Sequence, residues 1–127
     1  VQKMKNYQDK TIAVVGVSER EHKYGYKIFR DLIKHDFQVE GINPRGGELF
    51  GKKIYKDLKS LERVPEVVIT VVAPEITERI VEECIAMGVG EIWMQPGSES
   101  EAAVENAKLH AVKVTYNGCF MLQQGIW

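Results

Sequence analysis

The residues best suited to bind a phosphate lie in two short segments, each directly after an apolar run. Residues 16–18 read Gly-Val-Ser after the first run, and residues 43–45 read Asn-Pro-Arg after the second. The backbone N–H groups of a glycine turn, a serine hydroxyl and a helix N-terminus can together hold an anion. An arginine can bind a phosphate through two parallel hydrogen bonds. These two segments therefore predict a ligand that carries phosphate groups.

The first segment departs from the dinucleotide-binding fingerprint. A fingerprint turn has its third glycine five residues after the first, and this glycine lets the helix pack closely on the strand. Here Gly16 is followed by Ser18 and a longer polar loop, and the next glycine is Gly25, beside Tyr24 at the start of a helical pattern. We therefore expect a phosphate-binding loop that lacks the close glycine packing of a standard NAD site.

The second segment carries a cation where an NAD site carries an acid. In NAD-binding proteins an Asp or Glu at the end of the second strand holds the ribose 2′-hydroxyl, whereas Arg45 follows the second predicted strand here. A guanidinium favours a ribose that itself bears a phosphate, either the 2′-phosphate of NADP or the 3′-phosphate of coenzyme A (CoA). A loop arginine that only faces solvent is the alternative.

Strand and helix patterns alternate along the chain and must position these segments. Apolar runs typical of buried strands cover residues 11–17, 37–42, 66–73, 91–95 and 111–117. Helical spacing covers about 25–35, 74–87 (with Ile76 in the buried stripe) and 98–110 (with Ser98 and Glu101 as a capping box). The order predicts an α/β fold, one Rossmann-like, doubly wound domain over residues 1–127, with its core at about 11–119 and a mostly parallel sheet of five to six strands.

In such folds the ligand lies beyond the carboxyl ends of the strands. This rule selects five segments, each rich in turn-forming residues. The candidate binding residues are Gly16, Val17, Ser18, Tyr24, Gly25, Asn43, Pro44, Arg45, Val72, Ala73, Pro74, Met94, Gln95, Gly97, Asn117 and Cys119. Any one segment could be an ordinary turn, but five at one edge of a sheet indicate a binding site.

The chain resembles the stand-alone CoA-binding domain proteins, which are similar to the CoA-binding N-terminal domain of the succinyl-CoA synthetase alpha subunit. The segments that carry the resemblance read IAVVGVS, INPRGGELFGKKIYKDLKSL, VVITVVAPE, MGVGEIWMQPGSES and NGC, and they extend from about residue 11 to residue 119. The loop EREHKYG differs from the glycine-rich turn of the synthetase.

The resemblance implies a role for each candidate residue. Residues 16–18, with Tyr24 and Gly25, would approach the CoA phosphates, and residues 43–45 would lie by the adenosine and its 3′-phosphate. Residues 72–74 would line the adenine or pantetheine side of the groove. The remaining candidates would flank the pantetheine arm (Met94, Gln95 and Gly97) or match a short Asn/Asp-x-Cys element (Asn117 and Cys119).

Composition and charge exclude several classes of function. The chain has 127 residues and a net charge of −1, without the basic excess typical of nucleic-acid binding. No apolar stretch approaches the roughly 20 residues of a membrane span, and the first residues lack the apolar centre of a signal peptide. The two cysteines are not in a metal-ligand spacing. We expect a cytoplasmic protein without a metal, a membrane or a nucleic acid as partner.

No catalytic set emerges from the three histidines, His22, His35 and His110, which are far apart in the sequence. The prediction is therefore non-catalytic binding of CoA or an acyl-CoA. The alternatives are an NADP- or NAD-binding sensor and an interaction protein with a degenerate nucleotide pocket. The apolar tail, residues 120–127, is expected to cover a sheet edge or to contact a second copy in a homo-oligomer. Cys119 is either a small buried residue or a thiol able to form a mixed disulfide with CoA.

Overall fold

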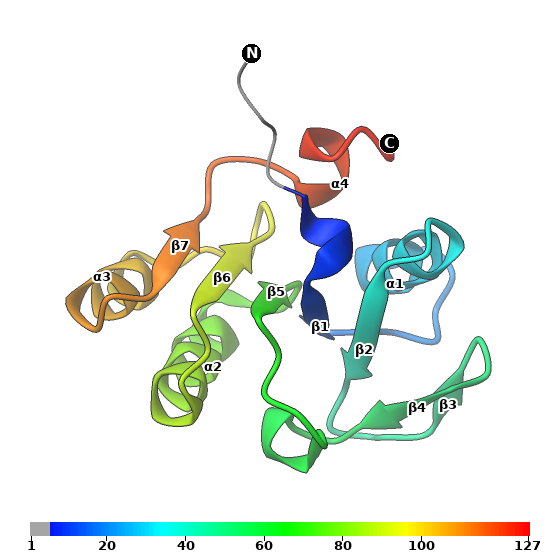
Figure 1. Ribbon diagram of the computed structural model, residues 1–127, viewed down its shortest axis with the longest axis horizontal. Coiled ribbons are helices and arrows are strands. Elements are labelled where there is room, and N and C mark those ends of the chain that lie inside the picture. The colour runs from blue at the N-terminus through cyan, green and yellow to red at the C-terminus, as the bar shows by residue number, and fades with distance from the viewer. Residues whose placement is uncertain (1–5) are drawn as a thin grey trace.

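Seven strands form the central sheet, in the order β3-β4-β2-β1-β5-β6-β7. The computed structural model describes residues 6–127 (Figure 1). The strands are β1 (Thr11–Val15), β2 (Gln38–Ile42), β3 (Glu48–Leu49), β4 (Lys52–Tyr55), β5 (Val67–Thr70), β6 (Glu91–Met94) and β7 (Lys113–Thr115). All pairs are parallel except the hairpin of β3 and β4. The predicted count of five to six was too low, because β3 has only two residues and lies in a turn-rich segment.

The helices cover both faces of the sheet, as a Rossmann-like fold requires. They are α1 (Tyr24–Lys34), α2 (Pro74–Met87), α3 (Glu101–Leu109) and the short α4 (Phe120–Gln123), with 3₁₀ turns at Tyr7–Asp9 and Leu58–Ser60. Figure 1 shows α2 and α3 together, apart from α1 and α4. None of the helices formed by residues 6–127 has the length and apolar character that a bilayer crossing requires.

The central strands are buried on both faces, which explains their continuous apolar runs. In β1, Ala13 and Val15 pack with α2 and α3, whereas Ile12 and Val14 pack with α1 and α4. Strands β5 and β6 are buried along their whole length. The strands thus separate two apolar cores and contribute side chains to both.

Two details of the helices differ from the prediction. The N-cap of α3 is Ser100, whose hydroxyl accepts a hydrogen bond from the Ala103 N–H. Ser98 does not cap the helix, because its hydroxyl is buried and bonds to the carbonyls of Thr70 and Gln95. In α2 the expected buried residue Ile76 is 37% exposed. The helix otherwise begins at Pro74 and ends at the left-handed Gly88, as predicted.

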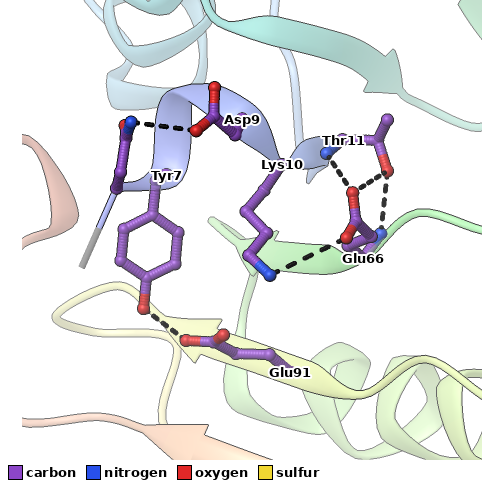
Figure 2. A network of polar contacts seen from close by, with 7 residues as sticks. Tyr7, Asp9, Lys10, Thr11, Glu66 and Glu91 are labelled. Carbon is purple, nitrogen blue, oxygen red and sulfur yellow. Dashed lines mark hydrogen bonds and ion pairs between the residues drawn. The ribbon is translucent and has the colours of Figure 1, made fainter.

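The segment before β1 is fastened by polar contacts at both of its ends (Figure 2). The Tyr7 hydroxyl donates to the carboxylate of Glu91, and the Tyr7 ring is buried. The carboxylate of Glu66 accepts from the Thr11 N–H at 3.0 Å and lies 3.8 Å from the Lys10 ammonium. These contacts join the start of β1 to the starts of β5 and β6.

The apolar tail folds back onto its own domain. Phe120 and Met121 are fully buried, and the Phe120 ring lies 5.1 Å from the Tyr7 ring. The Trp127 indole N–H donates to Asp31 of α1 at 2.7 Å. The tail therefore covers the α1 face of the sheet, and the most apolar part of it is not available to a second copy.

Candidate functional site

The carboxyl ends of β1 and β5 mark the point where the strand order reverses. From β1 the chain adds β2 and β4 on one side, then returns to place β5 on the other. Such a switch point is where open α/β sheets bind ligands. Gly16 follows β1 at this point, with φ at +111°. A Cβ there would lie 2.3 Å from the Val71 carbonyl oxygen, so only glycine allows this approach.

Gly25 packs directly on the turn that Gly16 begins. A Cβ on Gly25 would lie 2.0 Å from the Gly16 carbonyl oxygen. The start of α1 therefore rests on the end of β1 without an intervening side chain. The expectation that close glycine packing is absent was wrong, because Gly25 supplies that packing from the far side of a longer loop.

A pocket of about 330 Å³ opens beside this turn. Its walls come from the loop after β1, the loop after β2 and the β3–β4 hairpin. The lining residues are Val17, Ser18, Glu19, Arg20, Lys23, Asn43, Arg45, Gly46, Glu48, Leu49 and Ile54. The pocket thus joins the two segments that the sequence singled out for phosphate binding.

Three cations line the pocket, namely Arg20, Lys23 and Arg45. All three residues are exposed, and none forms an ion pair with another described residue. The Ser18 hydroxyl oxygen accepts from the Arg20 N–H at 3.0 Å, which leaves its own hydrogen to donate. Carboxylates are also present at Glu19 and Glu48. The site offers unpaired positive charge together with hydrogen-bond acceptors.

The hairpin that forms the outer wall is fixed to α1 by its tip. Phe50 and Gly51 make a two-residue loop with both φ angles positive, at +54° and +74°, as a tight hairpin turn requires. The Phe50 ring lies 5.0 Å from the Tyr26 ring and 6.1 Å from the Phe29 ring. These aromatic contacts hold a non-glycine residue in the left-handed region, so the hairpin has a defined place over the pocket.

Asn43 connects the loops around the pocket. Its Nδ2 donates to the Val17 carbonyl at 2.6 Å, and its Oδ1 accepts from the Arg45 N–H at 2.8 Å. Its backbone N–H donates to the Tyr55 carbonyl, and its carbonyl accepts from the Gly46 N–H. Pro44 occupies the second position of the resulting turn, where its fixed φ is favourable.

The other predicted site residues lie outside this pocket. Val72 is half-buried next to Gly16, Ala73 is the exposed N-cap of α2, and Pro74 is its first residue. Gly97 and Asn117 are exposed in loops. The structure groups residues 72–74 with the Gly16 turn but does not bring residues 97 and 117 into the pocket.

Met94 and Gln95 have structural roles. The Met94 side chain is fully buried with the core residues of α2 and α3, so it is not placed to flank a ligand. The Gln95 amide is buried as well, and its Oε1 accepts from the Phe120 N–H at 2.7 Å while its Nε2 donates to the Cys119 sulfur at 3.3 Å. Gln95 thereby fixes the start of α4 beside β6.

The two cysteines differ in their surroundings. Burial raises the pKa of the Cys84 thiol to about 12, which keeps it protonated and unreactive in the α2 core. Cys119 is half-buried at the N-cap of α4. Within residues 6–127 no three His, Cys, Asp or Glu side chains are grouped to hold a metal ion.

Sequence reasoning missed several pocket residues, chiefly Arg20, Lys23 and Glu48. Arg20 and Lys23 belong to the polar loop between Gly16 and Gly25, and their basic character was the available signal. Glu48 belongs to β3, which pairs only with β4. No pattern in the sequence indicates that this strand would form a pocket wall.

Comparison with known proteins identifies relatives over most of the chain. The family of the CoA binding domain matches residues 10–124. An ADP-forming acetate–CoA ligase of Methanocaldococcus jannaschii is 34% identical over 80 residues, which are 63% of this chain and 11% of the ligase. The alpha subunit of an ADP-forming acetate–CoA ligase of Pyrococcus furiosus is 27% identical over 85% of this chain and 27% of the subunit. The chain therefore spans about a tenth to a quarter of the length of these curated relatives.

A solved structure of similar size has the same fold. A conserved hypothetical protein from Pyrococcus furiosus superposes with a TM-score of 0.85 at 32% identity, over 90% of this chain and 98% of that one.

Proposed function

The chain belongs to the CoA binding domain family, and from this premise we propose that it binds CoA or an acyl-CoA without catalysing a reaction on it. The observation that carries the proposal is the pocket at the ends of β1 and β2, where three cations have no ion-pair partner among the described residues. A ligand with several phosphates would supply those partners.

In this proposal the two predicted segments bind different parts of the ligand. The Ser18 N–H and hydroxyl contact the pyrophosphate at the start of α1, where the helix dipole favours negative charge. The N–H groups of Gly16 and Val17 both donate to the Ile42 carbonyl and so hold the turn in place for this contact. Arg45 binds the phosphate on the ribose, assisted by Arg20 and Lys23. The pantetheine arm then leaves the pocket along residues 72–74, past the close approach of Gly16 to Val71.

The proposal assigns no chemistry to the site: the pocket lining contains neither histidine nor cysteine, and its two carboxylates, Glu19 and Glu48, are exposed. His22 is exposed in the loop, and His35 and His110 follow the last turns of α1 and α3. None of the three is placed against another candidate catalytic group.

Calorimetric titration with CoA, 3′-dephospho-CoA, NADP and NAD tests the proposal. We expect CoA to bind more tightly than 3′-dephospho-CoA, because in the latter complex Arg45 has no ribose phosphate to bind. We also expect CoA to bind more tightly than NADP, because NADP carries its ribose phosphate at the 2′ position and lacks the pantetheine arm that we assign to residues 72–74. Arg45→Ala should weaken CoA by about 10- to 100-fold, since a charged hydrogen bond contributes roughly 1.5–3 kcal/mol.

The control is Arg79→Ala, an exposed arginine on α2 outside the pocket, which should leave CoA affinity unchanged. Binding of NADP without binding of CoA would refute the proposal in favour of an NADP sensor. Equal losses for CoA and 3′-dephospho-CoA in Arg45→Ala would refute the role of Arg45.

A further inference from the structure

Asn43 uses its polar groups inside the protein. The backbone N–H, the backbone carbonyl, Oδ1 and Nδ2 each make a hydrogen bond to another residue. The residue is half-buried, and the 2.6 Å bond to the Val17 carbonyl joins the loop after β2 to the turn after β1. With these bonds the side chain connects the two loops beside the pocket.

Arg45 stands on the turn that Asn43 holds. The Oδ1 of Asn43 accepts from the Arg45 N–H, and the Asn43 carbonyl accepts from the Gly46 N–H at 2.8 Å, which closes a turn around Pro44. The backbone of Arg45 is therefore fixed, while its guanidinium is exposed and has no partner among residues 6–127. The position from which this cation reaches the pocket is set by Asn43.

We propose that Asn43 is a positioning residue that sets the separation between Arg45 and the Gly16 turn. It thereby selects nucleotides that carry a phosphate on the 2′ or 3′ oxygen of the ribose in addition to the phosphates on the 5′ oxygen. The inference rests on the proposed function and deepens it. A nucleotide with only the 5′ phosphates needs the Gly16 turn alone. A nucleotide with both phosphate groups gains from Arg45 only if the two loops keep their relative position, and the Asn43–Val17 bond supplies that link.

The side chain at position 43 can be changed so that one bond is lost and the other kept. In Asn43→Ser the hydroxyl can still accept from the Arg45 N–H, since serine forms a similar turn, but it is too short to reach the Val17 carbonyl. Asn43→Thr likewise keeps a hydroxyl as acceptor for the Arg45 N–H and is too short to reach the Val17 carbonyl. Both variants remove the hydrogen bond to Val17 that links the two loops, and both keep the hydrogen bond that holds the turn at Arg45.

The test measures the ratio of the Kd values for 3′-dephospho-CoA and CoA in the wild type, Asn43→Ser, Arg45→Ala and the double variant. We expect Asn43→Ser to lower this ratio at least threefold relative to wild type. The double variant should have the same ratio as Arg45→Ala alone, because Asn43 acts through Arg45. Asn106→Ser, at a half-buried asparagine of α3 outside the pocket, is the matched control and should keep the wild-type ratio. If circular dichroism shows that Asn43→Ser is unfolded, Asn43→Thr gives the same comparison without adding a charge beside Arg45.

A purely structural role would lower the melting temperature and weaken both ligands equally, so an unchanged ratio in a folded Asn43 variant would overturn this inference alone. A reduced ratio that persists when Arg45 is already alanine would overturn it too. A wild type that binds neither nucleotide would overturn the proposed function, and this inference with it.

Discussion

The contact between Gly16 and Gly25 determines the geometry of the binding turn. The Gly16 carbonyl oxygen occupies the space where a side chain on Gly25 would begin. Most substitutions of glycine by alanine inside a helix are stabilising by about 1 kcal/mol, because alanine has the higher helix propensity. Gly25 is within α1. In Gly25→Ala the higher helix propensity of alanine would therefore stabilise the protein, whereas the clash with the Gly16 carbonyl oxygen would destabilise it.

We therefore expect Gly25→Ala to destabilise the protein by about 2 kcal/mol, since overpacking against backbone atoms typically costs 1–3 kcal/mol. Urea unfolding followed by circular dichroism measures this change. Gly90→Ala is the control, because a Cβ on Gly90 would meet no atom within 4 Å, and its effect should stay within about 0.5 kcal/mol. A stabilised Gly25→Ala variant would show that α1 can move away from the turn without cost.

Single residues were singled out from the sequence where their position in the strand pattern could be compared with that of a known nucleotide-binding site. Arg45 was identified because it stands where an NAD site carries an acid, and Gly16 because it ends an apolar run. The four internal hydrogen bonds of Asn43 were not visible in the sequence, because they depend on loops that come together only in the fold. The full burial of Met94 was not visible either, because the end of a strand carries both rim residues and core residues.

At the scale of elements, α1 is held from two sides. Phe50, at the tip of the β3–β4 hairpin, packs on Tyr26 of α1. The tail contacts the same helix through the hydrogen bond that Trp127 donates to Asp31. The hydrogen bond from the Arg30 guanidinium at 2.7 Å lowers the pKa of Asp31 below its ordinary value of 3.8, and the bond from Trp127 lowers this pKa further. The ionised carboxylate thus helps to fasten the tail to the helix.

Because the folded-state pKa of Asp31 is lowered, its contribution to stability is complete above pH 3.8 and is lost as the pH falls through the lower folded value. Asp31→Asn should reduce the free energy of unfolding at neutral pH by about 1 kcal/mol, a typical net value for a hydrogen bond. The difference from wild type should shrink below pH 3.8. Urea unfolding at a series of pH values measures it.

Glu105→Gln, at an exposed position of α3, is the control, and its free energy of unfolding at neutral pH should stay within about 0.5 kcal/mol of wild type. A difference between wild type and Asp31→Asn that stays constant across the acid range would contradict the assignment.

The elements with long periodic patterns were predicted, whereas β3 and α4 were not. The apolar spacing of α1 and the limits of α2 from Pro74 to Gly88 were visible in the sequence. Strand β3 and helix α4 are too short to show a period, and they form because tertiary contacts hold Phe50 and Phe120 in place. Ser98 was misread as a cap because Thr70, its partner on a neighbouring strand, is distant in the sequence.

For the whole molecule, the two apolar cores share the same strands, so neither should unfold alone. Phe120 is fully buried in the core of α1 and α4 and lies 5.2 Å from the Trp93 ring. We expect Phe120→Ala to destabilise the protein by about 3–5 kcal/mol. Leu122 on the same short helix is 62% exposed, and Leu122→Ala should change stability by less than about 0.5 kcal/mol.

Tryptophan fluorescence reports on Trp93 in the core and on Trp127 in the tail, and circular dichroism reports on all helices. The two signals should give the same midpoint in wild type and in both variants, as a cooperative single domain requires. Separate midpoints would refute the prediction of one domain.

The sheet ends in very short strands at both edges, and this limits how copies of the chain can associate. Strand β3 has two residues and β7 has three, and the exposed residues Glu48 and Lys113 place charge on these edges. Short, charged edges offer few free backbone groups to a further strand, which protects a protein from edge-to-edge aggregation. Copies of this chain should therefore stay separate even at high concentration, because their sheets have little free edge through which to pair.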